Sequence, residues 1–272
     1  MSMMMVTDLD GTLLDGQSLL SEDNRQALDE LREHGVVRVV TTGRSLYSAR
    51  KVIDDEFPID YLSVSSGALV LDWRTRSILD SHDMSVEQAA PAIRALFDRG
   101  IDFMIHQGTP DNHHFVYHRT GSPNPDFERR IDRYREFAGE WDREPPTGNI
   151  CQLLGVEPAS IPSHYRELVA ELADLNVVLT TSPLDHQSRW IEIFPPHVSK
   201  ASSARLIAKR HGIAHECIAA IGNDFNDRQL LEWAHRAFVV ANAPTELREQ
   251  YAVVASNDDN GFGEAARLLL AS

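Results

Sequence analysis

Short apolar runs that stop at polar residues define the first part of the chain. Residues 3–7, 36–42 and 61–65 are apolar and partly β-branched, and they are predicted to be buried strands. Residues 21–35 and 45 to about 55 lie between these runs and are predicted to be helices. An alternation of strands and helices is typical of a parallel sheet with right-handed crossover connections.

The same alternation returns near the end of the chain. Residues 217–221 and 237–240 are short apolar runs that are predicted to be strands. Residues 202–211, 228–234 and 261–270 are predicted to be helices. The two ends of the chain therefore share one pattern.

The middle of the chain, from about residue 82 to residue 189, has a different character. Residues 84–100 are predicted to form a helix, and residues 126–141 are strongly charged and are predicted to form a solvated helix. Polar loops surround them, and residues 145–148 (PPTG) form a turn. We interpret this stretch as a second domain inserted into the first.

The composition is ordinary for a globular protein, but the charge is not balanced. The 272 residues are 42% hydrophobic and 25% charged, with a net charge of -15. Such a charge disfavours nucleic acid and anionic membranes as partners. It would also repel a phosphorylated substrate, so a metal or local positive charge must offset it at any phosphate site.

Cysteine usage and hydropathy indicate a cytoplasmic protein. Cys151 and Cys217 are the two cysteines, which suits a reducing compartment better than a disulfide scaffold. The apolar N-terminus is short and lacks the features of a signal peptide. No apolar run approaches the roughly 20 residues needed to span a membrane. The sequence does not indicate an oligomeric state.

Four of the predicted strands end in polar residues. These residues are Asp8 with Asp10, then Thr42, then Ser65 with Ser66, and finally residues 223–227. Binding sites in open parallel sheets form beyond the carboxyl ends of the strands. We therefore expect these groups to converge.

Asp8 and Asp10 are the strongest candidates for catalysis. Two carboxylates held this close repel each other unless a cation lies between them or one keeps its proton. A carboxylate can attack phosphorus, and a protonated neighbour can donate to the leaving oxygen. The alternative is a turn or helix cap rich in Asp and Gly. The apolar strand before the pair and the Thr-Leu-Leu after it favour the catalytic interpretation.

Three further groups suit a metal or a phosphate. Residues 223–227 (NDFND) offer oxygen ligands of the kind that Mg²⁺ prefers, although a capping turn is the alternative. Thr42 and Gly43 offer a hydroxyl and backbone N–H groups to phosphate oxygens, or simply cap a helix. Lys200 opens a helix, where a cation is unfavourable, and this hints at a bound phosphate rather than a surface charge. For Arg44, which follows this pair, a solvated charge is the simple alternative.

Several other chemistries find no support in the sequence. The 12 histidines, including His106, form no HExxH motif and are predicted to lie mostly at the surface. The signatures GxSxG, GxGxxG and GxxxxGK[ST] do not occur, which argues against a serine hydrolase, a dinucleotide-binding protein and a P-loop nucleotide-binding protein.

Taken together, the motifs resemble those of the haloacid dehalogenase superfamily, in its Cof-type branch of sucrose-phosphatase-like sugar phosphatases. The matching segments are residues 8–14 (DLDGTLL), 41–44 (TTGR), 197–200 (HVSK), 222–227 (GNDFND) and 256–261 (SNDDNG). They occur in order and span nearly the whole chain. The resemblance implies an α/β fold with a Rossmann-like parallel-sheet core, residues 1–80 and 190–272. It also implies an inserted α/β cap, residues 81–189, that excludes water and recognises the leaving group.

The resemblance also implies roles for individual residues. Asp8 would be the nucleophile, and Asp10 would protonate the leaving group and then activate the hydrolytic water. Thr42, Gly43 and Lys200 would hold the phosphate.

A magnesium ion is the cofactor that the resemblance implies. The Asp8 side chain, the backbone carbonyl of Asp10 and the fourth motif would bind it. That motif commonly begins Gly-Asp, whereas here it is Gly222-Asn223, so either Asn223 or Asp224 is the ligand. We expect Asp224 together with Asp227, and we expect Asn226 to support the phosphate or the loop.

The predicted function is hydrolysis of a small phosphate ester, most simply a sugar phosphate, through a phospho-aspartate. A phosphomutase of the same superfamily, which would need a bisphosphate activator, is the alternative enzyme. A non-catalytic ligand-binding protein on this fold is the alternative outside catalysis. His113, His114 and Arg119 are candidate substrate contacts in the insert, and a role for Ser66 is in doubt because the branch commonly has Asn there.

Overall fold

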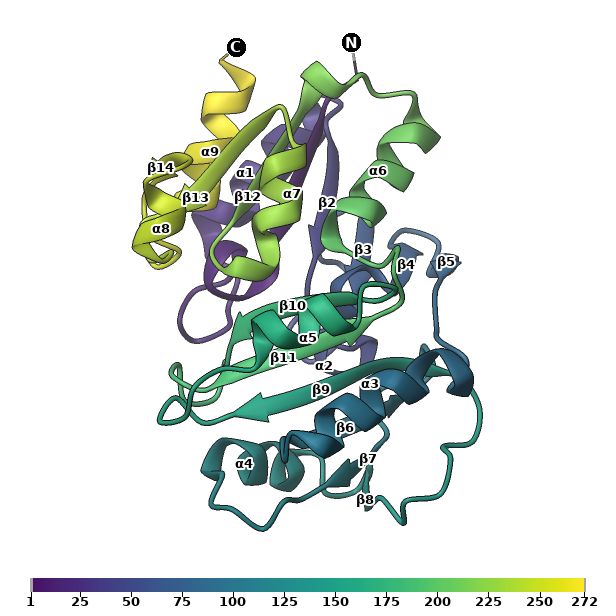
Figure 1. The fold of residues 1–272 in the computed structure, drawn as a ribbon. Helices are drawn as coiled ribbons and strands as arrows, with labels where there is room; N and C mark the ends of the chain where they lie inside the picture. Colours follow the sequence, from purple (N-terminus) through teal and green to yellow (C-terminus); the bar gives the residue numbers. More distant parts are fainter. Residues whose placement is uncertain (1, 272) are drawn as a thin grey trace. The chain divides into compact units, whose positions relative to one another are not determined.

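The structure, a computed structural model, describes residues 2–271. The chain divides into two compact units (Figure 1). The first unit comprises the described residues up to Arg44, Ser48–Asp80 and those from Ser199 onward. The second unit comprises Ser45–Tyr47 and Ser81–Val198.

An eight-stranded sheet forms the centre of the first unit, in the order β14-β13-β12-β1-β2-β3-β4-β5. The strands from β14 to β3 are parallel, and β4 runs antiparallel to β3. All five residues of β1 are buried, as expected for a central parallel strand that is covered on both faces. The bounds are β1 Met4–Asp8, β2 Val37–Thr41, β3 Tyr61–Val64, β4 Leu69–Asp72, β5 Ser77–Ser81, β12 Ile218–Gly222, β13 Arg236–Val240 and β14 Ala252–Val254.

Helices cover both faces of this sheet. α6 and α7 pack with apolar residues of β1, β12 and β13, whereas α1 and α9 pack against each other on the opposite face (Figure 1). Ser21 caps α1, because its Oγ accepts the backbone N–H of Asn24 at 3.2 Å. The bounds are α1 Glu22–Glu33, α2 Leu46–Ala49, α6 Lys200–His211, α7 Arg228–Trp233, α8 Thr245–Arg248 and α9 Gly261–Leu270.

The second unit has a six-stranded sheet of its own, in the order β10-β11-β9-β6-β7-β8. An apolar cluster joins α3 and α5 to one face, and a second cluster joins α4 to the other face. Its helices are α3 Val86–Asp98, α4 Pro125–Arg133 and α5 Tyr165–Glu171. Its strands are β6 Asp102–Gln107, β7 Phe115–His118, β8 Ala138–Glu140, β9 Ile150–Glu157, β10 Asn176–Thr181 and β11 Arg189–Phe194.

Two predicted helices are much shorter than expected. The helix predicted over residues 45–55 is limited to α2, and turns follow it, in one of which Asp54 Oδ1 accepts the N–H of Glu56 at 3.0 Å. The helix predicted over residues 126–141 ends at Arg133, and the segment after it forms β8. Pairing of β8 with β7 satisfies that backbone in a sheet rather than in a helix.

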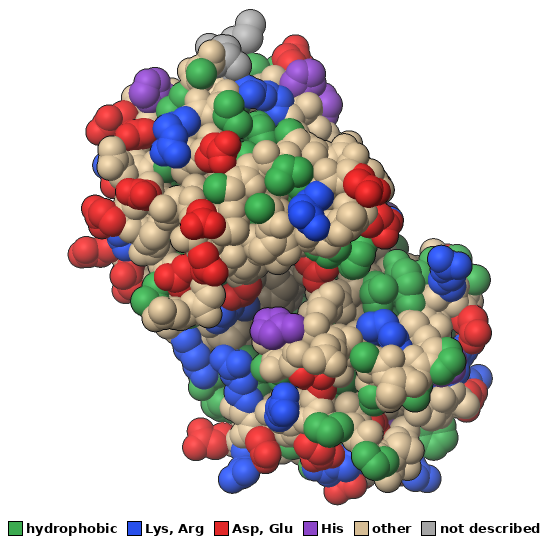
Figure 2. All heavy atoms as spheres, turned by 90° about the vertical axis from the view of Figure 1, so that its left-hand side faces the viewer, with side chains coloured by type: hydrophobic (Ala, Val, Ile, Leu, Met, Phe, Trp, Pro, Cys, Tyr) green, Lys and Arg blue, Asp and Glu red, His purple; other side chains and the backbone are tan. Residues whose placement is uncertain are grey.

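The predicted fold class is confirmed: the chain is an α/β protein with a mostly parallel central sheet and a second sheet. Within residues 2–271, no helix has both the length and the apolar character needed to cross a membrane. Figure 2 shows acidic side chains spread over the visible surface of the protein, in keeping with its net charge of -15.

Candidate active site

The carboxyl ends of three neighbouring parallel strands bring the first group of polar residues together. In the sheet register, Asp8 at the end of β1 lies opposite Thr41 of β2, and Thr7 lies opposite Ile221 of β12. Thr42 and Asn223 each follow directly on these strands. The sheet therefore places the first, second and fourth motifs at one edge.

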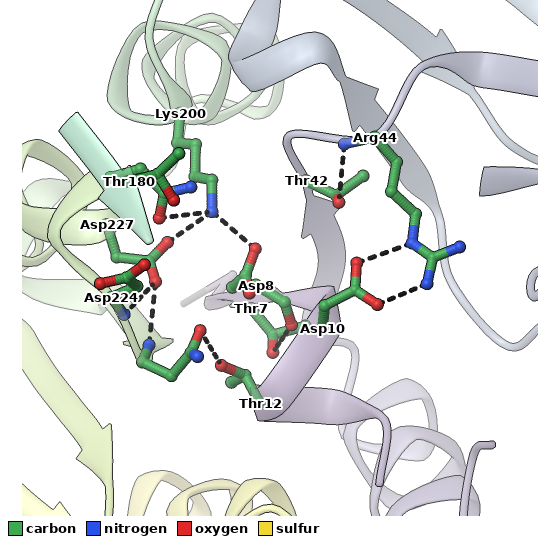
Figure 3. Close-up of polar contacts among 12 residues, drawn as sticks. Thr7, Asp8, Asp10, Thr12, Thr42, Arg44, Thr180, Lys200, Asp224 and Asp227 are labelled. Carbon is green, nitrogen blue, oxygen red and sulfur yellow. Dashed lines mark hydrogen bonds and ion pairs between the residues drawn. The ribbon is translucent and has the colours of Figure 1, made fainter. Parts of the chain in front are cut away.

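Lys200 forms the centre of a buried charge cluster (Figure 3). Its Nζ donates to Asp8 Oδ1 at 2.6 Å and to Asp227 Oδ1 at 2.7 Å. It also lies 3.4 Å from Asn226 Oδ1. Because the Lys200 side chain is only 1% exposed, the interpretation as a surface charge is wrong. Ser199 caps α6 and so fixes Lys200 in its first turn, where the side chain can point at the end of β1.

Burial and charge act in opposite directions on this cluster. Burial raises the pKa of Asp8 to about 7, Lys200 opposes the rise, and Asp227 adds to it. Burial alone would lower the pKa of Lys200, but the carboxylates of Asp227 and Asp8 outweigh it and raise that pKa above its ordinary value. Lys200 is therefore held as a cation beside the two carboxylates.

Asp227 also holds the loop after β12 in shape. Its Oδ2 accepts the backbone N–H of Asn223 at 2.8 Å and that of Asp224 at 3.1 Å. The carboxylate can approach this closely because Gly222 lacks a side chain, since a Cβ there would lie 2.5 Å from Asp227 Cγ. The Asp224 side chain makes a different contact from that of Asp227. Its Oδ1 accepts the N–H of Phe225 at 2.8 Å and caps the short turn that follows.

The side-chain amide of Asn223 lies against the first motif. One of its terminal atoms is 3.1 Å from Asp8 Oδ2 and 3.2 Å from the backbone oxygen of Asp10. With nitrogen in that place, the amide donates to both oxygens. With oxygen there, three oxygens converge, an arrangement that needs a cation between them.

These three positions fit magnesium. Adjacent ligands of an octahedral Mg²⁺ at its usual bond length are about 3 Å apart, which agrees with the two Asn223 separations. The donor set of carboxylate, carbonyl and amide oxygens is also the kind that this cation takes. This donor set differs from a cluster of acidic, His or Cys side chains, since no group of three or more of these that could hold a metal occurs within residues 2–271.

Arg44 binds both carboxylate oxygens of Asp10 (Figure 3). Its Nε donates to Asp10 Oδ2 at 2.7 Å and its Nη2 to Oδ1 at 2.5 Å. Arg44 Nη1 also donates to the carbonyl of Ser48 at 3.1 Å. The sequence-based interpretation of Arg44 as a solvated charge is therefore wrong. The place of Arg44 next to Thr42 at a strand end was the available signal in the sequence. Its partner, Asp10, could not be identified without the fold.

Thr42 lies buried in the loop between β2 and α2. Its Oγ1 accepts the N–H of Arg44 at 3.2 Å, and its carbonyl accepts the N–H of Ser66 at 2.9 Å. The Ser66 hydroxyl is 3% exposed and has no hydrogen-bond partner within the described residues. Thr12, which the sequence analysis did not single out, has its hydroxyl oxygen 3.1 Å from the same terminal atom of the Asn223 amide.

The candidate substrate contacts of the insert all lie in the second unit. His113 stacks on Tyr47, with ring centroids 4.5 Å apart, and lies beside His114. Arg119 forms an ion pair with Glu128, with its Nε 2.7 Å from Oε1. The Arg119 charge is thus neutralised inside the unit itself.

Comparison with known proteins identifies the class. The sequence profile of the haloacid dehalogenase-like hydrolases matches residues 5–265. The chain is 26% identical to the 5-amino-6-(5-phospho-D-ribitylamino)uracil phosphatase YwtE of Bacillus subtilis, covering 93% of each chain.

Two solved phosphatases share the fold. The first is BT1666 of Bacteroides thetaiotaomicron, with a TM-score of 0.78 and 18% identity, covering 100% of this chain and 96% of that one. The second is the sugar phosphatase BT4131 of HAD subclass IIB, with a TM-score of 0.77 and 15% identity over 98% of both chains. The protein belongs to the haloacid dehalogenase-like hydrolases, as its motifs predicted, and it is a phosphatase.

Proposed function

We propose that the protein is a magnesium-dependent phosphomonoesterase that acts through a phosphorylated Asp8. One observation carries the proposal: Asp8 has Lys200 on one carboxylate oxygen and Asn223 beside the other. Lys200 reduces the repulsion between the Asp8 carboxylate and an incoming phosphate on one side, and a cation held beside Asn223 would do the same on the other.

In the first step, a carboxylate oxygen of Asp8 attacks phosphorus and the bond to the ester oxygen breaks. For this step Asp10 must carry a proton on one oxygen, so the hydrogen bond from Arg44 to that oxygen opens; Asp10 then gives the proton to the departing oxygen, which leaves as an alcohol. In the second step, Asp10 takes a proton from water, the water oxygen attacks phosphorus, and phosphate leaves with Asp8 restored. The Thr42 loop and Lys200 orient the phosphoryl oxygens throughout.

Magnesium would be held by Asp8 Oδ2, the Asp10 carbonyl and Asn223, and it would neutralise charge on the phosphoryl group. Asn223 suits this position better than Asp224, because the Asp224 carboxylate points at the N–H of Phe225. Asp227 would act through Lys200 and the loop rather than as a direct ligand. Asn226 would steady Lys200.

A phosphorylated sugar or polyol is the substrate class that we propose. The support comes from relatives, since one is a phosphatase of a phospho-ribityl compound and one fold neighbour is a sugar phosphatase.

The direct test is phosphate release with p-nitrophenyl phosphate and a panel of sugar phosphates, with no bisphosphate added. Asp8→Asn should reduce turnover by at least about a thousandfold, because the amide is not a nucleophile. Asp55→Asn is the matched control, since that carboxylate is 70% exposed and lies outside the site. Removal of Mg²⁺ by a chelator should stop turnover, and added Mg²⁺ should restore it. An active Asp8→Asn enzyme would exclude the proposed intermediate.

A further inference from the structure

The last of the five matching segments, residues 256–261, has no part in the site described so far, yet it contacts the turn that carries Asp10. This turn follows β1 and comprises residues 9–14. Asn257, whose residue is 7% exposed, donates from its side-chain Nδ2 to the carbonyl of Leu14 at 3.0 Å. The last segment of the sequence pattern is therefore bound to the first one in the fold.

Asparagine side chains from three separate parts of the chain each hold one carbonyl of this turn. The donor is Nδ2 in every case: Asn242 binds the carbonyl of Gly11 at 2.9 Å, Asn24 that of Leu13 at 2.9 Å and Asn257 that of Leu14 at 3.0 Å. Asp10 and Gly11 lie outside the helical region, so the turn cannot satisfy all its carbonyls by regular helical hydrogen bonds. The asparagines supply donors that its own backbone lacks.

The amide of Asn242 has one orientation that satisfies both of its partners. Its Oδ1 accepts the backbone N–H of Asn257 at 3.0 Å, and its Nδ2 donates to the carbonyl of Gly11. A backbone N–H only donates and a carbonyl only accepts, so a reversed amide would lose both hydrogen bonds. The loop of residues 256–261 thus sets the direction in which Asn242 donates.

Gly11 is the residue of the turn that most needs an external partner. Its φ of +68° lies in the left-handed region, and a Cβ there would lie 2.7 Å from a terminal atom of the Asn223 amide. Glycine fits this place, but it also has the greatest backbone freedom and does not hold one conformation by itself. The peptide before Gly11 carries the Asp10 carbonyl, which lies 3.2 Å from the Asn223 amide. Rotation of the backbone at Gly11 would therefore turn that carbonyl away.

We propose that Asn242 is a positioning residue for the magnesium site. By holding the Gly11 carbonyl, it keeps the Asp10 carbonyl in the direction that the metal requires, and in this respect the inference rests on the proposed function. Asn242 acts through Gly11 and not on the metal itself. Asn24 and Asn257 bind the far end of the turn, and the backbone N–H of Asn257 orients the Asn242 amide.

Asn242→Asp is the test variant, because it keeps the size of the side chain and the acceptor for the N–H of Asn257. It replaces the donor by an oxygen, which repels the Gly11 carbonyl. Ala241→Asp is the matched control, since this exposed neighbour receives the same charge while the Asn242 amide stays in place. Asn242→Ala, which adds no charge, is the second variant and keeps the test decisive if the aspartate variant does not fold.

The first measurement is binding of Mg²⁺ to the metal-free protein by isothermal titration calorimetry. Loss of the hydrogen bond to Gly11 should raise the Kd for Mg²⁺ about fivefold in both Asn242 variants. An added negative charge alone has the opposite effect because it attracts the cation, so Ala241→Asp should bind Mg²⁺ at least as tightly as the wild type. A merely structural role would lower the stability in urea and leave this Kd unchanged.

The second measurement is hydrogen exchange over residues 9–14, followed by mass spectrometry without magnesium. Exchange should be faster in both Asn242 variants than in the wild type and in Ala241→Asp. An unchanged Kd in both Asn242 variants overturns the proposal, even where exchange is faster, because the turn would then not control the metal site.

Hydrogen exchange also separates this inference from the proposed function. A wild type that binds no Mg²⁺ contradicts the proposed function. In that case faster exchange in the Asn242 variants still supports the hold of Asn242 on the turn, whereas equal exchange overturns it.

Discussion

At the scale of single residues, the chemistry depends on which carboxylate each cation holds. Lys200 is shared by Asp8 and Asp227, while Arg44 takes both oxygens of Asp10. The sequence indicates Asp8, Asp10 and Lys200 through their motifs, because strand ends and a helix start can be predicted locally. It cannot indicate the partner of Arg44, because that contact spans 34 residues and depends on the order of strands in the sheet.

Removal of Arg44 should slow catalysis more than it weakens binding. Arg44→Ala frees the Asp10 carboxylate to rotate, so kcat should fall about 10- to 100-fold with a smaller change in KM. Steady-state kinetics on p-nitrophenyl phosphate measure both. Arg50→Ala, which removes a 45%-exposed arginine paired with Asp55, should have no such effect.

The double variant with Asp10→Asn decides how Arg44 acts. If Arg44 works by orienting Asp10, Arg44→Ala should add little to the loss caused by Asp10→Asn. Additive losses would instead mean that Arg44 contacts the phosphate directly.

At the scale of elements, the site depends on short loops that follow correctly predicted strands. β1, β2 and β12 lie within a residue or two of their predicted bounds, because apolar runs between polar turns are a strong local signal. The shape of the loop after β12 could not be predicted. It depends on the Asp227 carboxylate, which accepts hydrogen bonds from two backbone N–H groups. The carboxylate can lie there only because Gly222 has no Cβ.

A single methyl group at Gly222 should therefore disturb both stability and activity. In Gly222→Ala the new Cβ would lie 2.5 Å from Asp227 Cγ, so the carboxylate must move away from Lys200. We expect a loss of about 1–3 kcal/mol in unfolding free energy, as for other overpacked sites. Turnover should fall at least about tenfold, because Lys200 and the loop lose their common partner.

Gly139→Ala is the control for that experiment. A Cβ at Gly139 meets Val116 at 3.8 Å, an ordinary contact, in a strand far along the chain from the catalytic motifs. Urea unfolding and phosphate release should both stay near the original values there. Equal effects of the two substitutions would argue against a special role for the space above Gly222.

At the scale of the whole molecule, the two units differ in how far their sequences predict them. The first unit repeats one strand–helix pattern, and most of its elements were predicted. The second unit has antiparallel pairs between distant strands, such as β6 with β9, whose order no local pattern specifies. The prediction that most histidines lie at the surface fails for His106 for the same reason, since its burial comes from sheet pairing and from α4.

Buried His106 should make the protein less stable in mild acid. Its pKa is about 3 in the folded chain because of burial and the nearby charge of Arg130, whereas the unfolded chain has the ordinary value of 6.5. Below about pH 6.5 the unfolded state then binds more protons than the folded state. The contribution of the neutral His106 ring to the unfolding free energy is therefore complete above that pH and is lost progressively as pH falls toward about 3. From about pH 7.5 to about pH 5.5 this residue alone should remove on the order of 1 kcal/mol from the unfolding free energy.

Urea unfolding at both pH values, with the wild type and His106→Phe, isolates that contribution. The phenylalanine variant cannot take up the proton in the unfolded state, so its stability should fall less between the two pH values, by the same order of 1 kcal/mol. His34→Phe is the control, because His34 lies exposed at the end of α1 and no comparable burial acts on it. If His106→Phe and the wild type lose stability equally, the His106 ring takes up its proton without unfolding, and burial does not keep it neutral at that pH.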